Sequence, residues 1–146
     1  MGGTFDPIHF AHVRLGRAAR AILSLEKVLL IPAADPPLKP DCVASAMHRV
    51  RMVELAIASD PELEVCTIEL SRPGPSYTVD TLTELRERQP ERDLWFIIGS
   101  DALRGLDTWH RPERLFELAH LGVVVRSGEP VPTRLASLLP SRHAAA

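Results

Sequence analysis

Apolar and β-branched residues gather in short runs along the chain, and the segments between them carry apolar residues at a helical period. The runs cover residues 27–33, 63–70, 94–98 and 121–125. The helical segments cover residues 11–23, 45–59, 78–88 and 112–119, the last with Pro112 at a first helical position. This alternation predicts an α/β fold in which a parallel sheet is connected by crossover helices.

Three loops follow the ends of the predicted strands. In open parallel sheets, ligands bind at the carboxyl ends of the strands. The loops cover residues 32–40, 71–77 and 99–101. We therefore expect these loops to converge on one crevice.

Length and composition favour one folded domain over residues 1–146. The chain has 146 residues, of which 45% are apolar and 25% charged, and its net charge is −2. This balance implies neither a nucleic-acid partner nor a membrane surface. Arg14, Arg17 and Arg20 lie at helical spacing, and a solvated helix face explains them better than a polyanion site.

Cysteine usage and hydropathy favour a cytoplasmic protein. Cys42 and Cys66 are far apart and follow no metal-ligand spacing, so neither a disulfide framework nor a structural zinc site is expected. We expect no leader peptide and no membrane span, because no apolar stretch approaches about 20 residues. A reducing, cytoplasmic location fits these features.

The most informative stretch is Gly-Gly-Thr-Phe-Asp-Pro-Ile-His-Phe-Ala-His at residues 2–12. Glycines allow backbone N–H groups to approach an anion, and the helix expected from residue 11 would direct its N-terminus to the same point. His9 and His12 can project from one face of that helix start toward phosphate oxygens. Two glycines alone would favour a tight turn with hydrogen-bonded histidines, but the complete string favours a phosphate cradle.

This string resembles the signature of a nucleotidyltransferase superfamily in which His-x-Gly-His follows Gly-x-Phe-Asp-Pro. Ala11 stands where that family usually has glycine, and alanine is the smallest side chain that could replace it. The resemblance implies a Rossmann-like nucleotidyltransferase fold, with helices on both faces of a parallel sheet. It assigns ATP binding to Gly2, Gly3, Thr4, Phe5, His9, His12, Gly99 and Asp101.

Later motifs resemble, more narrowly, the bacterial nicotinate-nucleotide adenylyltransferases. They are Pro-Pro-Leu-Lys-Pro at 36–40, Ala-Met-His-Arg at 46–49, Arg-Pro-Gly-Pro-Ser-Tyr-Thr-Val-Asp-Thr-Leu at 72–82, Phe-Ile-Ile-Gly-Ser-Asp at 96–101 and Thr-Trp-His at 108–110. This resemblance implies adenylyl transfer from ATP to nicotinate mononucleotide in NAD biosynthesis, with release of pyrophosphate. The alternatives are a noncatalytic nucleotide-binding fragment, or a related enzyme that acts on nicotinamide mononucleotide or phosphopantetheine.

The same resemblance assigns substrate binding to Tyr77, Thr78 and Trp109. Trp109 offers a flat face for a pyridine ring, an interaction of about 1 kcal/mol, whereas Trp95, inside a predicted strand, fits a core-anchoring role better. Tyr77 and Thr78 precede a helix, where hydroxyl and backbone donors could hold the nicotinate carboxylate. Thr78 could also cap that helix, and the two roles are compatible.

Three charged residues have two open interpretations each. Lys39 suits a substrate phosphate, and its proline-rich loop favours that role over simple solvation. Arg49, near a helix start, could bind a substrate phosphate or pair with a carboxylate. Asp101 could accept hydrogen bonds from ribose hydroxyls, as the resemblance implies, or cap a helix.

The implied reaction is attack by a phosphate oxygen of the mononucleotide on the α-phosphorus of ATP. Because that oxygen is already ionised, neither a general base nor a covalent intermediate is expected. Catalysis would rest on loop N–H groups, His9, His12, Lys39 and a Mg²⁺ ion carried with ATP. No carboxylate cage is visible, so magnesium is expected on nucleotide oxygens and water, with no protein ligand.

Both ends of the chain depart from the resembling family. The family has a short apolar strand before its glycine loop, where here only Met1 precedes Gly2. It ends with an Ile-Ser-Ser-Thr segment and an arginine that bind the triphosphate, and Ser141-Arg142 matches that segment poorly. We therefore expect a fragment that lacks the first strand and the C-terminal motif and has reduced activity. The pattern leaves a homo-oligomer open.

Overall fold

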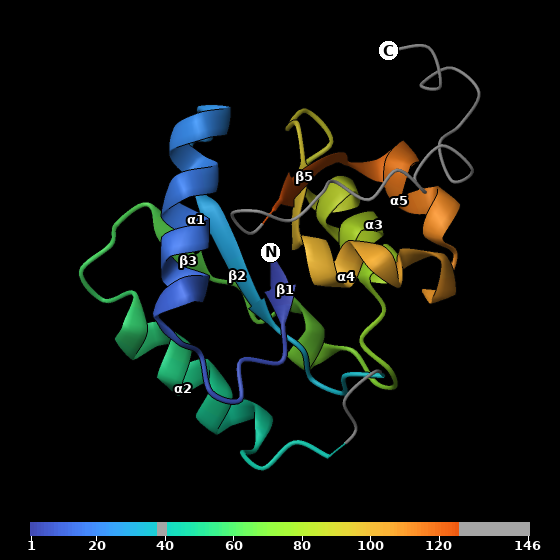
Figure 1. Ribbon diagram of the computed structural model, residues 1–146. Helices are drawn as coiled ribbons and strands as arrows, with labels where there is room; N and C mark the ends of the chain where they lie inside the picture. The colour runs from blue at the N-terminus through green and yellow to red at the C-terminus, as the bar shows by residue number, and fades with distance from the viewer. Residues whose placement is uncertain (38–40, 126–146) are drawn as a thin grey trace. The chain divides into compact units, whose positions relative to one another are not determined.

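The structure is a computed structural model that describes residues 1–37 and 41–125 (Figure 1). The chain divides into two compact units, Met1–Ser76 and Tyr77–Ala146. Lys39, Ser141 and Arg142, which the sequence singled out, lie outside the described residues. No described helix is long and apolar enough to cross a lipid bilayer.

The first unit is a three-stranded parallel sheet with two α-helices. Its elements are β1 (Gly2–Gly3), α1 (Phe10–Leu23), β2 (Val28–Pro32), α2 (Ala46–Ala56), β3 (Leu63–Val65) and the 3₁₀ helix η1 (Ile68–Ser71). The strand order is β1-β2-β3. Gly2 lies opposite Ile31, and Val28 lies opposite Leu63. The loops after β1 and β2 therefore leave the sheet at the same edge, as expected for a ligand-binding edge.

A short strand stands where the sequence predicted that the first strand would be missing. Besides the pairing of Gly2 and Gly3 with β2, the carbonyl of Met1 accepts a hydrogen bond from Ile31 N at 3.0 Å. The ammonium group of Met1 donates to the Leu29 carbonyl at 2.7 Å. The first three residues thus already form the part of the ladder that leads into the glycine loop.

Helix α1 packs closely onto the sheet of the first unit (Figure 1). A Cβ atom at Gly16 would lie 3.2 Å from Leu63 Cδ2 and 3.8 Å from Val28 Cγ1. Glycine at this position therefore lets the helix approach β2 and β3 closely. The helix begins after His9 and ends at Leu23, and the left-handed backbone of the C-cap residue Ser24 (φ 52°) turns the N–H of Leu25 back to the Arg20 carbonyl at 3.0 Å.

The second unit joins a pair of parallel strands to three α-helices. Its elements are α3 (Thr78–Arg88), β4 (Trp95–Gly99), α4 (Ser100–Arg104), the 3₁₀ helix η2 (Leu106–Thr108), α5 (Pro112–Leu118) and β5 (His120–Val124). Strand β4 pairs with β5, from Trp95 opposite His120 to Gly99 opposite Val124. One side of this pair contributes to a buried cluster of Val79, Leu82, Phe96, Ile98, Leu103, Leu106, Leu115, Leu118 and Ala119.

Besides β1 and η2, which the sequence did not predict, the predicted elements are confirmed with two differences. The helix expected at residues 78–88 has these bounds, and the other three expected helices begin and end within three residues of them. The apolar run at 63–70 is wrong as a single strand, because β3 ends at Val65 and η1 begins at Ile68. Helix α4 was not predicted, since its five residues are too few to show a period.

Candidate nucleotide-binding site

The loop that follows β1 depends on a close contact between Gly3 and Phe5. Phe5 has a left-handed backbone (φ 50°), and its side chain is buried at 2% exposure. A Cβ atom at Gly3 would lie 3.0 Å from Cε1 and Cζ of this ring, whereas one at Gly2 would meet only the Ile31 carbonyl, at 3.9 Å. Gly3 is therefore needed for the packing of Phe5, and only Gly2 keeps the open backbone that the sequence suggested for both glycines.

His9 and His12 lie together at the start of α1, as their spacing predicted. Their rings stack with centroids 3.8 Å apart and planes 27° apart. His12 Nδ1 accepts a hydrogen bond from the backbone N–H of His9 at 3.2 Å. This bond leaves Nδ1 without a proton and places the proton of the neutral ring on Nε2, which can donate to a phosphate oxygen.

The ring of His12 also contacts the ring of Phe5. The Phe5 ring meets it edge-on, with centroids 5.1 Å apart and planes 85° apart. His12 is half-buried, while His9 is exposed at the N-cap position. The loop and the first turn of α1 thus form one packed arrangement of Gly3, Phe5, His12 and His9. Its exposed side combines an imidazole with the N-terminus of a helix, a combination that favours anions.

The contacts of Arg49 match neither of the two partners that the sequence left open, a substrate phosphate or a carboxylate. Its side chain is 1% exposed, and its guanidinium donates to the main-chain carbonyls of Thr4, Ala34 and Ala44. None of the ion pairs found among residues 1–37 and 41–125 includes it. The structure therefore places Arg49 beneath the glycine loop, on protein carbonyls.

The loop after β2 is tied to the end of the first unit. Ser76 Oγ accepts from the backbone N–H groups of Ala34, at 3.0 Å, and Asp35, at 3.2 Å. The N–H of Ser76 donates to the Asp35 carbonyl at 2.8 Å. The serine that precedes Tyr77 in the motif at 72–82 thus holds the start of the proline-rich loop, a role that the sequence did not suggest. Lys39 itself lies outside the described residues.

In the second unit, Tyr77 stacks on His110. The two ring centroids are 4.3 Å apart and the planes differ by 24°. Tyr77 is the N-cap residue of α3, and Thr78 is the first helical residue, so the expected capping role of Thr78 is wrong. His110 was not among the predicted site residues, although it ends the Thr-Trp-His motif. Its stacking on Tyr77 places two flat side chains at the start of α3.

The two tryptophans are both half-buried but lie against different neighbours. Trp109 packs against the buried cluster of the second unit and lies 6.0 Å from Phe96 between ring centroids. Trp95 lies beside His120, with ring centroids 4.9 Å apart. Side chains alternate along a strand, so Trp95 points away from the face that carries Phe96 and Ile98. The core-anchoring role of Trp95 stays a prediction, and Trp109 combines half-burial with an accessible part of its ring.

Gly99 and Asp101 lie at the end of β4. Gly99 is the N-cap residue of α4, and no atom lies within 4 Å of the position that its Cβ would take. Asp101 is exposed in the first turn, where Oδ1 accepts from Arg104 Nη1 at 2.8 Å. Asp101 therefore does not cap the helix, and the open backbone of Gly99 lies two residues before it.

Asp6 is a further loop residue that sequence reasoning did not assign. Its Oδ2 accepts from Val43 N at 2.6 Å, and its Oδ1 accepts from Ala44 N at 3.2 Å. The only signal for this role was its place within Gly-Thr-Phe-Asp-Pro. Among the described residues, no group of His, Cys, Asp and Glu side chains could hold a metal ion.

Comparisons with known proteins agree on one family. The model of the cytidylyltransferase-like family matches residues 1–143. A probable nicotinate-nucleotide adenylyltransferase of Herpetosiphon aurantiacus is 47% identical over 128 residues, covering 88% of this chain and 65% of the relative. One from Thermus thermophilus is 49% identical over 130 residues, covering 89% of this chain and 69% of the relative.

The chain is shorter than these relatives. It spans 65%, 60% and 64% of the relatives from Herpetosiphon aurantiacus, Acidithiobacillus ferrooxidans and Pelobacter propionicus. Among solved structures, Plasmodium falciparum nicotinic acid mononucleotide adenylyltransferase complexed with NaAD is similar, with a TM-score of 0.81 at 19% identity, over 95% of this chain and 69% of that one. At this identity the likeness shows the fold, which is the Rossmann-like fold expected from the sequence.

Proposed function

Because this chain belongs to the cytidylyltransferase-like family, we propose that it transfers an adenylyl group from ATP to nicotinate mononucleotide. The products are nicotinate adenine dinucleotide and pyrophosphate, in NAD biosynthesis. The names of the relatives support this substrate pair. The observation that carries the proposal is the packed His9–His12 pair at the start of α1, with the proton of His12 directed to Nε2.

The glycine loop is the proposed site for the phosphates of ATP. Gly2 offers an open backbone, and Thr4 leads into the turn that Gly3 and Phe5 make possible. His12 Nε2 and the first N–H groups of α1 are the proposed donors to the phosphate oxygens, and exposed His9 adds a second imidazole. Gly99 and exposed Asp101 are the proposed contacts of the adenosine part, with the carboxylate accepting from ribose hydroxyls.

The chemistry needs no proton acceptor, because the attacking phosphate oxygen of nicotinate mononucleotide is already ionised. This oxygen forms a bond to the α-phosphorus of ATP, and the bond to the bridging oxygen of pyrophosphate breaks in line. The proposed work of His9, His12 and Lys39 is to hold the phosphates and stabilise the charge that develops on them. Mg²⁺, carried with ATP, would supply further positive charge. The described residues suit a magnesium ion held by nucleotide oxygens and water, because the Asp6 carboxylate already accepts two main-chain N–H groups.

The pyridine mononucleotide is the proposed ligand of Tyr77, Thr78 and Trp109. The half-buried ring of Trp109 is fixed by the cluster beneath it, so it can offer its face to the nicotinate ring at little entropic cost. The hydroxyl of Thr78 and the N–H groups at the start of α3 are suitable donors to the carboxylate. We also propose a cytoplasmic location, supported by Cys42 and Cys66, which form no disulfide among the described residues.

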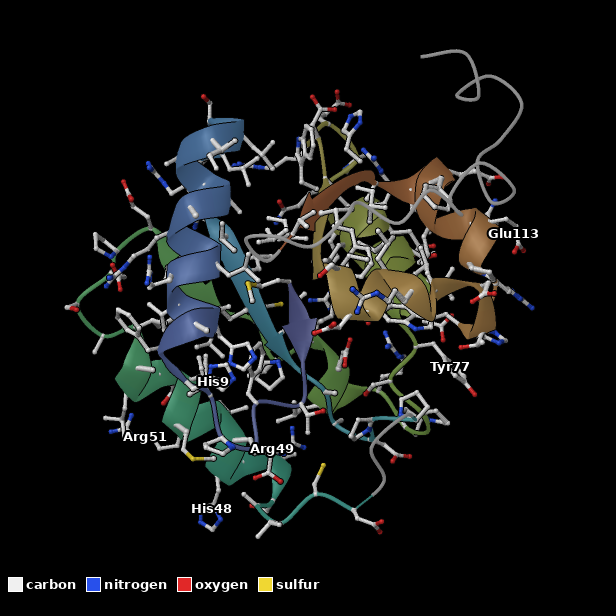
Figure 2. All side chains as sticks on the ribbon, viewed as in Figure 1. His9, His48, Arg49, Arg51, Tyr77 and Glu113 are labelled. Carbon is white, nitrogen blue, oxygen red and sulfur yellow. The ribbon has the colours of Figure 1, made fainter. Side chains whose placement is uncertain are left out.

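The test is pyrophosphate release from ATP and Mg²⁺ with nicotinate mononucleotide, compared with nicotinamide mononucleotide and phosphopantetheine. We would measure it on the 146-residue chain and on a version extended at both ends, and expect slower turnover in the 146-residue chain. His12→Ala is expected to lower kcat about 100-fold. The control is His48→Ala, since His48 is exposed on α2 and points away from the loop (Figure 2).

Each outcome separates the proposal from an alternative. If pyrophosphate is released only with nicotinamide mononucleotide, or only with phosphopantetheine, that compound and not nicotinate mononucleotide is the acceptor of the adenylyl group. ATP binding without pyrophosphate release in either version, both being folded, would establish the noncatalytic binding module. Equal losses in His12→Ala and His48→Ala would refute the role of the histidine pair.

A further inference from the structure

A buried guanidinium joins three separate segments of the first unit. Arg49 Nη1 donates to the Thr4 carbonyl at 2.7 Å, Nε to the Ala44 carbonyl at 3.2 Å, and Nη2 to the Ala34 carbonyl at 3.4 Å. Thr4 lies in the loop after β1, Ala34 in the loop after β2, and Ala44 in the segment that leads into α2. Figure 2 shows Arg49 between α2 and the loop after β1, while Arg51 points outward from the same helix.

Asp6 holds one of these segments from the other side. Its carboxylate accepts the N–H groups of Val43 and Ala44, while Arg49 binds the carbonyl of Ala44. The backbone N–H of Ala44 thus binds Asp6 of the glycine loop, and the carbonyl of Ala44 binds Arg49. Asp6 and Arg49 together fix the position of residues 4–6 against the segment before α2.

These contacts are not explained by packing of α2 alone. Val50 and Val53, at 4% and 0% exposure, already supply the apolar face of the helix. A charged group beside them costs free energy of desolvation, and in the described residues no carboxylate is paired with Arg49 to offset it. What the guanidinium provides instead is a planar fork whose three nitrogen atoms reach acceptors in fixed directions. These hydrogen bonds therefore fix the loops after β1 and β2 relative to one another.

We propose that Arg49 is a positioning residue that holds the loop after β1 and the loop after β2 in one fixed arrangement, with Asp6 as its partner on the glycine loop. The inference rests on the proposed function, in which the first loop binds the phosphates of ATP and the second leads to Lys39, whose proposed role is to hold the phosphates of the reacting nucleotides. Arg49 touches neither nucleotide. Loss of the Arg49 guanidinium is expected to weaken the binding of both nucleotides, because each loop then loses the contact that fixes it to the other.

The direct test is amide hydrogen exchange of the 146-residue chain without any substrate. Four N–H groups report the arrangement, because each donates from one of the joined segments: Ala33 to Gly3, Ala34 to Ser76 at the end of the first unit, and Val43 and Ala44 to Asp6. Arg49→Lys keeps the charge but offers one point of contact in place of the fork. We expect these four amides to exchange about tenfold faster in this variant. The Ile57 amide, which donates to Val53 inside the same region, should be unchanged.

Two matched variants separate positioning from stability. Arg51→Lys alters an exposed arginine on the same helix that pairs with Glu54, and it should leave all amides and the activity unchanged. Val53→Ala removes fully buried side-chain atoms from α2, so it should lower overall stability without selecting the four reporter amides. If Arg49→Lys leaves these amides as in the unaltered chain, or if Val53→Ala accelerates them equally, the proposal is overturned.

Steady-state kinetics provide the second readout, on the extended version if the 146-residue chain turns over too slowly. Arg49→Lys should raise KM about tenfold for both ATP and nicotinate mononucleotide. Asp6→Asn should do the same to a smaller degree, and the double variant should lose less than the sum because both residues act on Ala44. A change in KM for one substrate alone would contradict the shared arrangement. Because amide exchange needs no turnover, failure of the proposed reaction and failure of the positioning role are distinguishable.

Discussion

The candidate residues of the two units are held in place by different forces. In the first unit, the glycine loop and its neighbours are fixed by polar groups that bind main-chain atoms, with Arg49 and Asp6 as the clearest examples. In the second unit, Trp109 and Tyr77 are fixed by contact with a buried apolar cluster and with a neighbouring ring. The difference matches the proposed ligands: a phosphate chain needs donors in fixed directions, and a flat ring needs a rigid apolar face.

This comparison teaches where each kind of site is vulnerable. Hydrogen bonds depend on direction, so a small displacement of a loop removes several at once. Apolar contact depends on filled volume, so a cavity beneath a ring loosens it without altering any polar group. Substitutions in the two units should therefore separate effects on phosphate binding from effects on the pyridine ring.

The largest effect is expected from a cavity beneath Trp109. Leu106 is fully buried, and its carbonyl accepts from the backbone N–H of Trp109 at 3.1 Å. Leu106→Ala should lower the free energy of unfolding by about 3 kcal/mol and raise KM for the mononucleotide more than KM for ATP. Urea unfolding and steady-state kinetics measure these changes. Leu30→Ala, equally buried in β2, is the control: it should be as destabilising, and a matching rise in mononucleotide KM there would contradict the comparison.

A smaller effect is expected from the tryptophan itself. Trp109→Ala removes a half-buried ring that packs on Phe96, so it should cost about 2 kcal/mol of stability and most of the affinity for nicotinate mononucleotide. Trp95→Ala removes a ring that lies beside His120 instead. Calorimetric titration of the mononucleotide into both variants measures the difference, and comparable losses of affinity would refute the ligand-facing role of Trp109.

In the first unit, a buried amine makes stability depend on pH. Burial of the Met1 ammonium group lowers its pKa from 8.0 to about 6. Between these values the unfolded chain binds more protons than the folded chain, so the free energy of unfolding should rise with pH from 6 to 8, by on the order of 2 kcal/mol. Urea unfolding at several pH values measures the slope. A version extended before Met1 keeps every histidine but lacks this amine, and a slope equal to that of the 146-residue chain would contradict the assignment.

Local features of the structure could be predicted from the sequence more completely than long-range contacts. Helix α3 was placed at its observed bounds because Thr78–Arg88 carries a complete local pattern between a polar start and Gln89. The glycine loop and the histidine pair were also local, since one string of residues contains them. Helix α4, by contrast, is one short turn after β4 and carries no period that could have announced it.

The contacts that could not be predicted all join residues distant in sequence. Arg49 was expected on a phosphate or a carboxylate, because those are the usual partners of an arginine near a helix start. Its observed partners Thr4 and Ala34 lie 45 and 15 residues away, and they become neighbours only when β1 and β2 pair. The packing of Trp109 on Phe96 is long-range as well, because the orientation of β4 decides that Phe96, and not Trp95, faces the buried cluster.

The smallest expected effect distinguishes the two glycines of the loop. A methyl group at Gly3 would lie 3.0 Å from the Phe5 ring, so this ring, which also meets His12 edge-on, must shift. Gly3→Ala should therefore cost about 1 kcal/mol of stability and shift the nuclear magnetic resonance signals of the His12 ring protons. Gly2→Ala meets only a carbonyl at 3.9 Å and should leave both stability and the His12 ring signals unchanged. If Gly2→Ala shifts the His12 ring signals as much as Gly3→Ala does, the ring of Phe5 does not position this histidine, and the polar half of the comparison would rest on Arg49 and Asp6 alone.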